Sequence, residues 1–346
     1  MQSSSIVKPV LILTCAAVLL TAMHFAASFL VPVLLGIFFA TLLTPIYRWL
    51  KKRRMPAGLA LLLSIGFLML VALFLVLLVG RSLNMLASSL DSYSAQFSQR
   101  QSDLTAATES MSQTIDLTPL LSALDPAKLV DVLSFALSTL AGIFKDGLVI
   151  LMVTIFFLVE SPLFVARLRR AFGEDHSLPQ NITSLAQMMI SYFGLRALVN
   201  LVNAVATGLM LWLFGIEYAG LWAVLIFFLS FIPYVGAVLS MIPPLILAYA
   251  QGGLGLVIVI GLLSVVINGI SENLVQPMVM GKGLSISPTA VFLSVMFWMF
   301  ILGGPGAFLA MPLTMALILF MGSFAETRGF TAMLVTTSDP ARIKTA

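Results

Sequence analysis

The sequence predicts an all-α protein that crosses a membrane many times, and three observations carry this prediction. Hydrophobic residues make up 60% of the 346 residues, charged residues only 9%, and the mean hydropathy is +1.09. Soluble domains average about 45–50% apolar and about 25% charged residues. Apolar runs of about 20 residues, the length that crosses a bilayer as a helix, recur along the chain. Basic residues gather in short stretches between these runs.

Eight apolar runs are candidates for membrane-spanning segments. The first is predicted to be retained in the mature protein, because no clear small-residue cleavage site follows it. The runs cover residues 9–28, 30–50, 57–80, 141–163, 190–214, 221–250, 254–275 and 288–322. We expect six to eight transmembrane helices, because two of the runs in the C-terminal half are interrupted.

Clusters of basic residues orient these helices. Four consecutive basic residues, Lys51 to Arg54, separate the second and third runs, and Arg167, Arg169 and Arg170 follow the fourth. Short loops rich in lysine and arginine stay in the cytoplasm, so both clusters and both termini are predicted to be cytoplasmic. The polar segment 89–140 lies between the two clusters and is expected on the opposite side of the membrane.

The third span is predicted to continue as a helix beyond the membrane surface. No proline or glycine occurs between Ser82 and Thr118, and apolar residues recur there every seven positions, at Leu83, Leu90, Phe97, Leu104 and Met111. A stripe of this kind requires a partner helix. The partner could be the returning segment near 126–140 or a helix of another protomer, and the sequence leaves both open.

Two apolar runs in the C-terminal half are broken at membrane depth. Proline and glycine divide the runs 221–250 and 288–322 into halves of about 14 residues, or about 21 Å, which are too short to cross a bilayer comfortably. Paired broken segments point to a transporter binding site, and we expect them to act as gates. The candidate gate residues are Pro233, Gly236, Pro277, Gly303, Gly304 and Gly306.

The two broken runs also resemble each other at an offset of 70 residues. This offset places Gly236 on Gly306 and, further upstream, Asn203 on Asn273. We interpret the match as a candidate internal repeat. If the broken runs are re-entrant hairpins, the two repeats are inverted with respect to each other; if they are full spans, the chain crosses the membrane eight times.

Polar residues inside the apolar runs form two groups that could line a path for a solute or an ion. Spacings of 3 and 4 place the first group on one helical face, and the second group surrounds a lone intramembrane carboxylate. The groups are Arg196, Asn200, Asn203 and Thr207, and then Asn268, Ser271, Glu272, Asn273 and Gln276. A carboxylate that leaves water seeks a cation or a proton, which suits ion or proton coupling. The alternative is structural: interface anchors, a solvated helix end and hydrogen bonds between helices.

Several classes of function find no support in the sequence. The single cysteine, Cys15, and the two histidines, His24 and His176, have no partners at metal-ligand spacing. No phosphate loop, dinucleotide-binding glycine pattern or catalytic motif occurs, so we expect no cofactor, no metal and no enzymatic activity. The net charge of +4 is small, which argues against nucleic-acid binding.

Several motifs resemble the autoinducer-2 exporter family of PerM-like permeases. They are Phe231 to Gly236, Ile242-Pro243-Pro244, Glu272-Asn273 with Gln276-Pro277 and Gly281, Gly283-Leu284-Ser285, and the last segment from Val291 to Pro312. The resemblance implies an oligomeric secondary transporter of the bacterial inner membrane. Many members carry Asp where this chain has Glu272, and some lack an acid there, so the resemblance does not make Glu272 an essential proton carrier.

We therefore expect a secondary transporter that exports a small polar solute such as autoinducer-2, with a proton gradient as the candidate driving force. A monovalent cation–proton antiporter and a non-transporting membrane scaffold remain the alternatives. The expected organisation has five parts in chain order. They are the N-terminal transmembrane helices (1–88), an extracytoplasmic helical segment (89–140), a fourth helix with a cytoplasmic linker (141–186), a transport core (187–325) and a cytoplasmic tail (326–346). The expected partners are the lipid bilayer, the solute or cation, and further copies of the chain.

Overall fold

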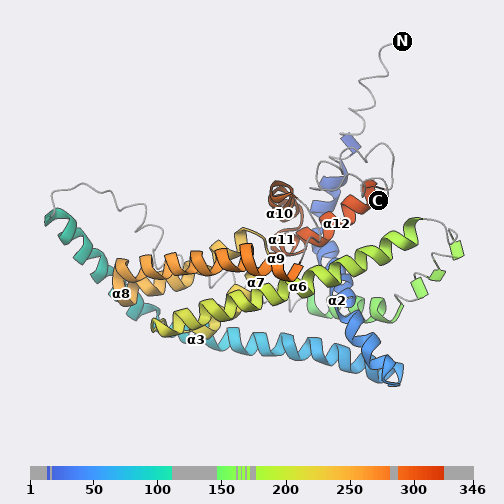
Figure 1. Cartoon of the computed structure of the whole chain (residues 1–346), viewed down its shortest axis with the longest axis horizontal. Coiled ribbons are helices and arrows are strands. Elements are labelled where there is room, and N and C mark those ends of the chain that lie inside the picture. The colour runs from blue at the N-terminus through green and yellow to red at the C-terminus, as the bar shows by residue number, and fades with distance from the viewer. Residues whose placement is uncertain are drawn as a thin grey trace, which may run out of the picture. The chain divides into compact units, whose positions relative to one another are not determined.

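Every regular element in the described part of the chain is a helix, as the sequence predicts (Figure 1). The computed structural model describes residues 14–15, 18–110, 146–160, 163–164, 166–167, 170–171, 177–280 and 287–322. The predicted returning segment at 126–140 and the tail at 326–346 lie outside these residues. So do His176 and residues 9–13 and 16–17 of the first predicted span.

Four of the described helices are long and apolar enough to cross a membrane. They are Ala27–Lys52, Ala57–Leu78, Ile182–Leu213 and Val235–Met278, and three shorter apolar helices accompany them. Only 6% of the most apolar window in Ala57–Leu78 is buried inside the protein. An exposed apolar surface of this size requires surrounding lipid, because the contact of apolar side chains with water is unfavourable. The chain is therefore a multi-pass membrane protein.

The bounds of the described helices differ in places from those of the predicted runs, and two helices continue through internal prolines. In chain order they are α2 (Ala27–Lys52), α3 (Ala57–Ser110), α6 (Ser177–Leu213), α7 (Ala219–Leu229), α8 (Val235–Ile270), the π-helical turn η1 (Ser271–Val275), α9 (Gln276–Met280), α10 (Pro288–Leu302), α11 (Gly304–Phe308) and α12 (Ala310–Gly322). The 54 residues of α3 form one unbroken helix of about 81 Å, so the predicted continuation past the membrane span is confirmed as far as Ser110.

The chain folds into two compact units, each assembled from separate stretches of sequence. The first unit contains residues 1–65, 146–191 and 283–346, and the second contains 66–145 and 192–282. The second unit holds α7, α8 and most of α6, and its core is built around buried Trp222 and Tyr249. The transport core predicted at 187–325 includes parts of both units.

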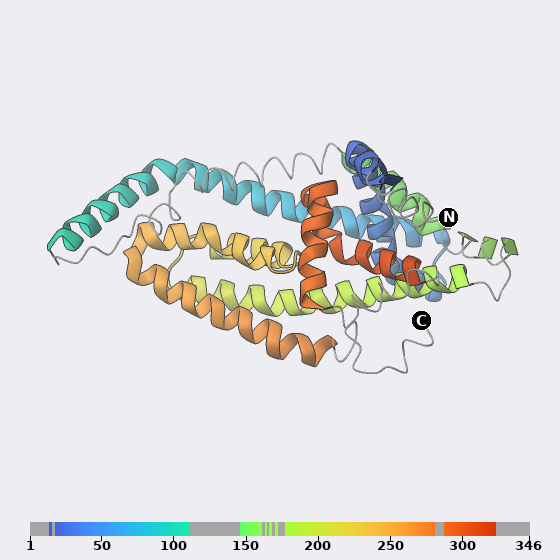
Figure 2. The ribbon, with the colours of Figure 1, turned by 90° about the horizontal axis from the view of Figure 1, so that it is seen from above.

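The run 221–250 is a helical hairpin in the second unit. The chain leaves α7, bends through residues 230–234, and returns antiparallel along the first half of α8 (Figure 2). Tyr234, with a φ of 63°, turns the backbone at the bend, and Gly253, with a φ of 71°, reverses it again within α8. The 11 residues of α7 span only about 16 Å, about half of a hydrocarbon core of about 30 Å.

The run 288–322 is a second helical hairpin, in the first unit. Ser287 caps α10 by accepting the N–H of Ala290, and α10 ends at Gly303, whose φ of 70° suits glycine. The chain then returns as α11 and α12. The indole of Trp298 donates to Thr314 Oγ1 over 3.0 Å and ties the two arms together. Both broken runs are therefore hairpins rather than single straight helices.

One buried glycine closes each hairpin. A Cβ atom on Gly236 would overlap the carbonyl oxygen of Leu229, and a Cβ atom on Gly306 would overlap the carbonyl oxygen of Trp298. In both cases the glycine of the returning arm packs directly on the backbone of the first arm. The two glycines are also the pair matched by the 70-residue offset, so the two hairpins share this packing feature.

We expect Gly236→Ala and Gly306→Ala to destabilise the protein by about 1–3 kcal/mol or more, because the added methyl group collides with backbone that has no rotamer to change. Thermal unfolding of the purified protein in detergent measures the effect. Gly255→Ala and Gly58→Ala are the matched controls, since a Cβ atom at either position meets no atom within 4 Å. Equal stability of all four variants would contradict the packing role of the two hairpin glycines.

Candidate functional site

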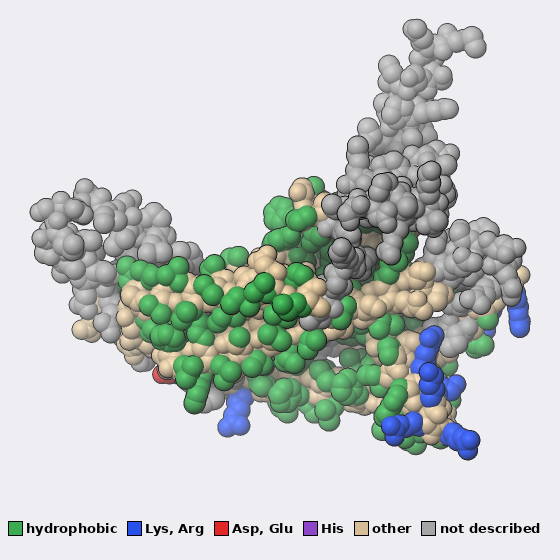
Figure 3. All heavy atoms as spheres, in the orientation of Figure 1, with side chains coloured by type: hydrophobic (Ala, Val, Ile, Leu, Met, Phe, Trp, Pro, Cys, Tyr) green, Lys and Arg blue, Asp and Glu red, His purple; other side chains and the backbone are tan. Residues whose placement is uncertain are grey.

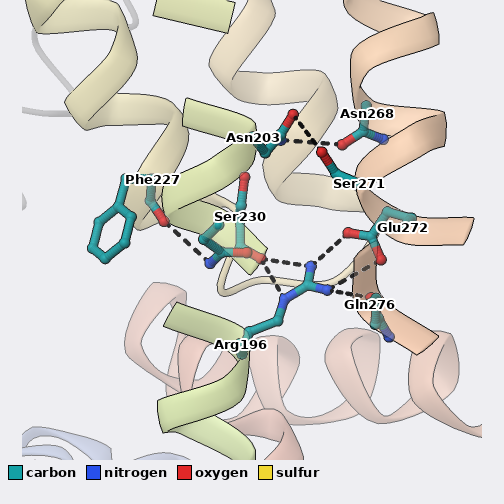
Figure 4. Close-up of polar contacts among 9 residues, drawn as sticks. Arg196, Asn203, Phe227, Ser230, Asn268, Ser271, Glu272 and Gln276 are labelled. Atoms are coloured by element: carbon teal, nitrogen blue, oxygen red, sulfur yellow. Dashed lines mark hydrogen bonds and ion pairs between the residues drawn. The ribbon is translucent and has the colours of Figure 1, made fainter. Parts of the chain in front are cut away.

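A stripe of buried polar side chains runs along α6 in the second unit. Arg196, Asn200, Asn203 and Thr207 are each 5% exposed or less, within a helix whose other residues are mostly apolar. Their spacing of 4, 3 and 4 residues places them on one face. Figure 4 shows Arg196 and Asn203 directed toward the bend after α7 and toward the helix that carries Glu272. The predicted stripe therefore faces other polar groups rather than lipid.

Arg196 and Glu272 form a two-pronged ion pair. Arg196 Nη2 donates to Glu272 Oε1 over 2.9 Å, and Arg196 Nη1 donates to Glu272 Oε2 over 3.1 Å (Figure 4). Arg196 Nη1 also donates to Gln276 Oε1 over 2.8 Å. The arginine side chain is 6% exposed and the glutamate side chain 38%. The cation is thus enclosed, whereas one side of the carboxylate remains accessible.

The guanidinium of Arg196 also caps the C-terminal end of α7. Its Nε and Nη2 atoms donate to the carbonyl oxygen of Ser230 over 3.2 Å and 2.9 Å. The last carbonyls of a helix lack partners within the helix and carry partial negative charge, so a cation stabilises them. One residue therefore joins the bend of the first hairpin to the helix that carries Glu272.

Asn200 caps the same helix end one turn further along α6. Its Nδ2 atom donates to the carbonyl oxygen of Phe227 over 3.2 Å. The N–H of Phe231 would bond that oxygen in a continuing α-helix, but it bonds Phe228 instead. Asn200 thus satisfies a carbonyl that the end of α7 has released.

A second, looser cluster lies further along α6. Asn203 Nδ2 donates to Asn268 Oδ1 over 3.3 Å, and Ser271 Oγ donates to Asn203 Oδ1 over 3.5 Å. Asn273 takes no part in it: its side chain is exposed and donates to the carbonyl of Gly269 in its own helix over 2.9 Å. The structure therefore brings Asn203, Asn268 and Ser271 together and leaves Asn273 outside the network.

The helix widens into a π turn where it carries Glu272. Gln276 donates its N–H to Ser271, five residues back, and Pro277 follows with no N–H to offer Asn273. Along an α-helix, four residues rotate about the helix axis by slightly more than one full turn, whereas along a π-helix they rotate by slightly less than one. The π turn therefore compensates for the excess rotation between Asn268, Glu272 and Gln276, so that all three side chains stay directed toward α6. Pro277 explains why the widening occurs here.

Ser230 contributes a hydroxyl group that the sequence analysis did not single out. The residue is 4% exposed, and its Oγ atom has no hydrogen-bond partner among the described residues. Figure 4 shows this hydroxyl pointing away from Arg196, on the side where Asn203 lies. A buried hydroxyl without a partner costs about 1–3 kcal/mol, so this group is a candidate contact for a bound solute or a water molecule. Its position directly after an apolar helix and before a Phe-Ile-Pro bend was the available sequence signal.

The candidate gate residues divide between the two units. Pro233 and Gly236 belong to the bend whose Ser230 carbonyl Arg196 binds, and Pro277 follows the π turn. Gly303, Gly304 and Gly306 form the bend of the second hairpin, in the first unit. The polar network described above consists only of residues of the second unit.

The charges of the network cancel, since it contains one arginine and one glutamate. Within the described residues, no group of three or more His, Cys, Asp or Glu side chains could hold a metal ion. The network thus offers hydrogen-bond donors and acceptors around a neutralised ion pair. Chemically, this arrangement suits a polar ligand without a strong net charge better than an isolated cation.

Comparison with known proteins shows that the chain is similar to membrane transport proteins. The sequence model described as "AI-2E family transporter" matches residues 13–326. A "Putative transport protein" of Haemophilus influenzae is 30% identical over 323 residues, which cover 92% of this chain and 93% of that protein. The "AI-2 transport protein TqsA" of Escherichia coli K12 is 26% identical over 334 residues, 96% of each chain. The "Putative transport protein YhhT" of the same organism is 28% identical over 302 residues, 87% of this chain and 86% of that one.

The ion pair predicts non-additive effects on stability. Glu272→Gln leaves the enclosed Arg196 without its counter-ion and should cost about 3 kcal/mol, somewhat less than for a fully buried pair because Glu272 is 38% exposed. The double variant Arg196→Leu/Glu272→Leu should lose less than the sum of the two single leucine variants, with a coupling of about 1–3 kcal/mol. Thermal unfolding in detergent measures all of these.

Asn273→Ala is the matched control for this cycle, because Asn273 is adjacent to Glu272 but bonds only within its own helix. We expect its unfolding midpoint to stay close to that of the wild type. Strictly additive losses for Arg196 and Glu272 would show that the two side chains do not interact in the folded protein.

Proposed function

Because this chain belongs to the AI-2E family of transporters, we propose that it is a secondary transporter that exports a small polar solute, such as autoinducer-2, across the bacterial inner membrane. The family supports transport, and one relative of 26% identity is named for autoinducer-2 transport. The solute and the direction of transport are part of the proposal.

The observation that carries this proposal is the Arg196–Glu272 pair with its contact to Ser230. Ionisable residues at membrane depth are costly and typically mark solute or ion paths. Replacement of a buried ion pair by apolar residues is often neutral or stabilising, so stability alone is a weak reason to retain one. Here the pair links the bend of the first hairpin to the π turn, two segments of the second unit in which the backbone departs from a regular α-helix.

We propose that the solute binds beside this pair and contacts Ser230, Glu272 and Gln276. The Ser230 hydroxyl has no partner among the described residues, and one side of Glu272 remains accessible. A solute hydroxyl could donate to the carboxylate and exchange a hydrogen bond with Ser230. Since Arg196 holds both the bend and the π turn, a solute that competes for its hydrogen bonds would loosen the two segments together, which is the property that a gate requires.

Exchange of a monovalent cation for a proton is the second candidate, because Glu272 is the carboxylate of the network and is partly accessible. The bidentate contact with Arg196 weighs against it, since a cation would have to displace a guanidinium from both oxygens. Proton coupling is compatible with either candidate: protonation of Glu272 would remove the charge that holds Arg196.

We expect expression of this chain in a bacterial strain that lacks related exporters to increase the extracellular accumulation of autoinducer-2. Glu272→Gln and Arg196→Gln should reduce the increase at least tenfold, because each removes one half of the pair, whereas Asn273→Ala should retain it. Protein amounts in the membrane are measured in parallel. If accumulation is unchanged and proteoliposomes show no solute flux, the export proposal fails. Sodium-driven pH changes that Glu272→Gln abolishes would favour the antiporter instead.

Ser230→Ala separates solute binding from folding. Removal of a buried hydroxyl without a partner should leave the unfolding midpoint unchanged or raise it, while transport should fall about fivefold to thirtyfold through the loss of about 1–2 kcal/mol of hydrogen bonding to the solute. Ser264→Ala is the control: this serine is buried as well, but its hydroxyl already bonds the carbonyl of Ile260 over 2.7 Å. Full transport by Ser230→Ala would exclude the serine from the site.

A further inference from the structure

A dense group of positive charges occupies the turn between α2 and α3, far in sequence from the polar network. Five of the seven residues from 48 to 54 are basic: Arg48, Lys51, Lys52, Arg53 and Arg54. All five are exposed, and Figure 3 shows them as a concentrated patch of blue. The group is called the basic turn below. It connects two helices that are long and apolar enough to cross a membrane, so the ends of both helices place it at a bilayer surface.

The charges of the basic turn find no neutralising partner within the part of the chain that the structure describes. Among the described residues, no Asp or Glu forms an ion pair with any of the five. Lys51 and Lys52 lie in the last turn of α2, where one or two cations complement the helix dipole. Five exceed that need, and their mutual repulsion is unfavourable unless anions approach from outside.

Two aromatic side chains accompany the basic turn. The Arg53 guanidinium lies over the Trp49 ring, 4.3 Å from its centroid, and Lys51 Nζ lies 5.8 Å from the centroid of the Tyr47 ring. Trp49 is 53% exposed. Tryptophan and tyrosine are enriched at the level of lipid headgroups, because their rings are apolar while their N–H and O–H groups are polar. The stacked Arg53 is therefore held at the depth where phosphate groups lie.

Arg54 adds a backbone observation that points the same way. Its φ of 61° lies in the left-handed region, where a residue with a Cβ atom is uncommon and glycine adopts the conformation without strain. The turn thus retains an arginine at a position where glycine would suit the backbone better. A strained residue that persists suggests a role for its side chain.

We propose that the basic turn is a binding site for the headgroup of an anionic phospholipid. Phosphate oxygens accept hydrogen bonds from guanidinium and ammonium groups, and each basic residue near an anionic surface contributes about 1 kcal/mol of attraction. A lipid fits better than an acidic protein segment, because the exposed Trp49 ring offers an apolar surface beside the charges and the adjoining helices end at the membrane. This inference is independent of the transported solute.

The test uses the purified full chain in nanodiscs of phosphatidylcholine that contain increasing fractions of phosphatidylglycerol. Brominated lipids quench nearby tryptophan fluorescence, and the difference between wild type and Trp49→Phe isolates the signal of Trp49 from those of the other three tryptophans. We expect brominated phosphatidylglycerol to quench Trp49 at least fivefold more effectively than brominated phosphatidylcholine. Lys51→Gln/Lys52→Gln/Arg54→Gln should abolish this preference, because each basic residue near an anionic surface contributes about fivefold to the attraction.

Two variants keep the result interpretable. Arg54→Gly should lower the preference for phosphatidylglycerol while its unfolding midpoint in phosphatidylcholine stays equal to the wild type or rises, since glycine relieves the positive φ. Arg81→Gln removes an exposed charge of α3 outside the turn and should leave the preference intact. Equal quenching by the two lipids would overturn the proposal. An equal loss in Arg81→Gln, or binding of an acidic peptide in place of the lipid, would overturn it as well.

Discussion

A guanidinium group enclosed among membrane helices must find its counter-charge and its hydrogen-bond acceptors within the protein, and this requirement organises the second unit. Arg196 uses three of its nitrogens to reach a carboxylate, a side-chain amide and a backbone carbonyl. The carbonyl and the carboxylate come from two segments that are not regular α-helix, and the amide of Gln276 lies directly after the second of them. The bend after α7 leaves the Ser230 carbonyl open, and the π turn keeps Glu272 and Gln276 on the side of α6. Without the arginine, both irregular segments would lose a partner that nothing else in the network replaces.

The two hairpins show how glycine allows short helices to fold back at membrane depth. Gly236 and Gly306 each bring the returning arm onto the backbone of the first arm, so the arms lie closer than any side chain would permit. The hairpins differ in what surrounds their bends. At the first bend, Arg196 binds the carbonyl of Ser230. In the last helical turn before the second bend, the Nδ1 atom of His24 lies 3.2 Å from the carbonyl oxygen of Ile301. Helix ends inside a membrane protein thus receive polar partners from another helix of the same unit, because lipid provides none.

Charge is distributed according to the depth of each region. At membrane depth the charges of the polar network cancel, which suits a polar solute that must enter and leave without a large electrostatic penalty. At the membrane surface the basic turn carries five positive charges with no carboxylate partner among the described residues, which suits a surface of phosphate groups. A few charged residues therefore serve two different environments within one chain.

Composition and periodicity alone determined the fold class, the multi-pass character and the unbroken course of α3 to Ser110, because these depend on local helix formation and on the length of apolar runs. The stripe on α6 and the lone Glu272 were also visible, since spacing along a helix determines which residues share a face. Only the tertiary structure decided that Arg196 pairs with Glu272, that Asn273 bonds within its own helix, and that the two broken runs fold as hairpins. Partners 76 residues apart meet through helix packing, and the π turn that aligns Glu272 depends on hydrogen bonds rather than on residue spacing. The unpartnered hydroxyl of Ser230 could not be predicted either, because a missing hydrogen bond is a property of the surroundings and not of the residue.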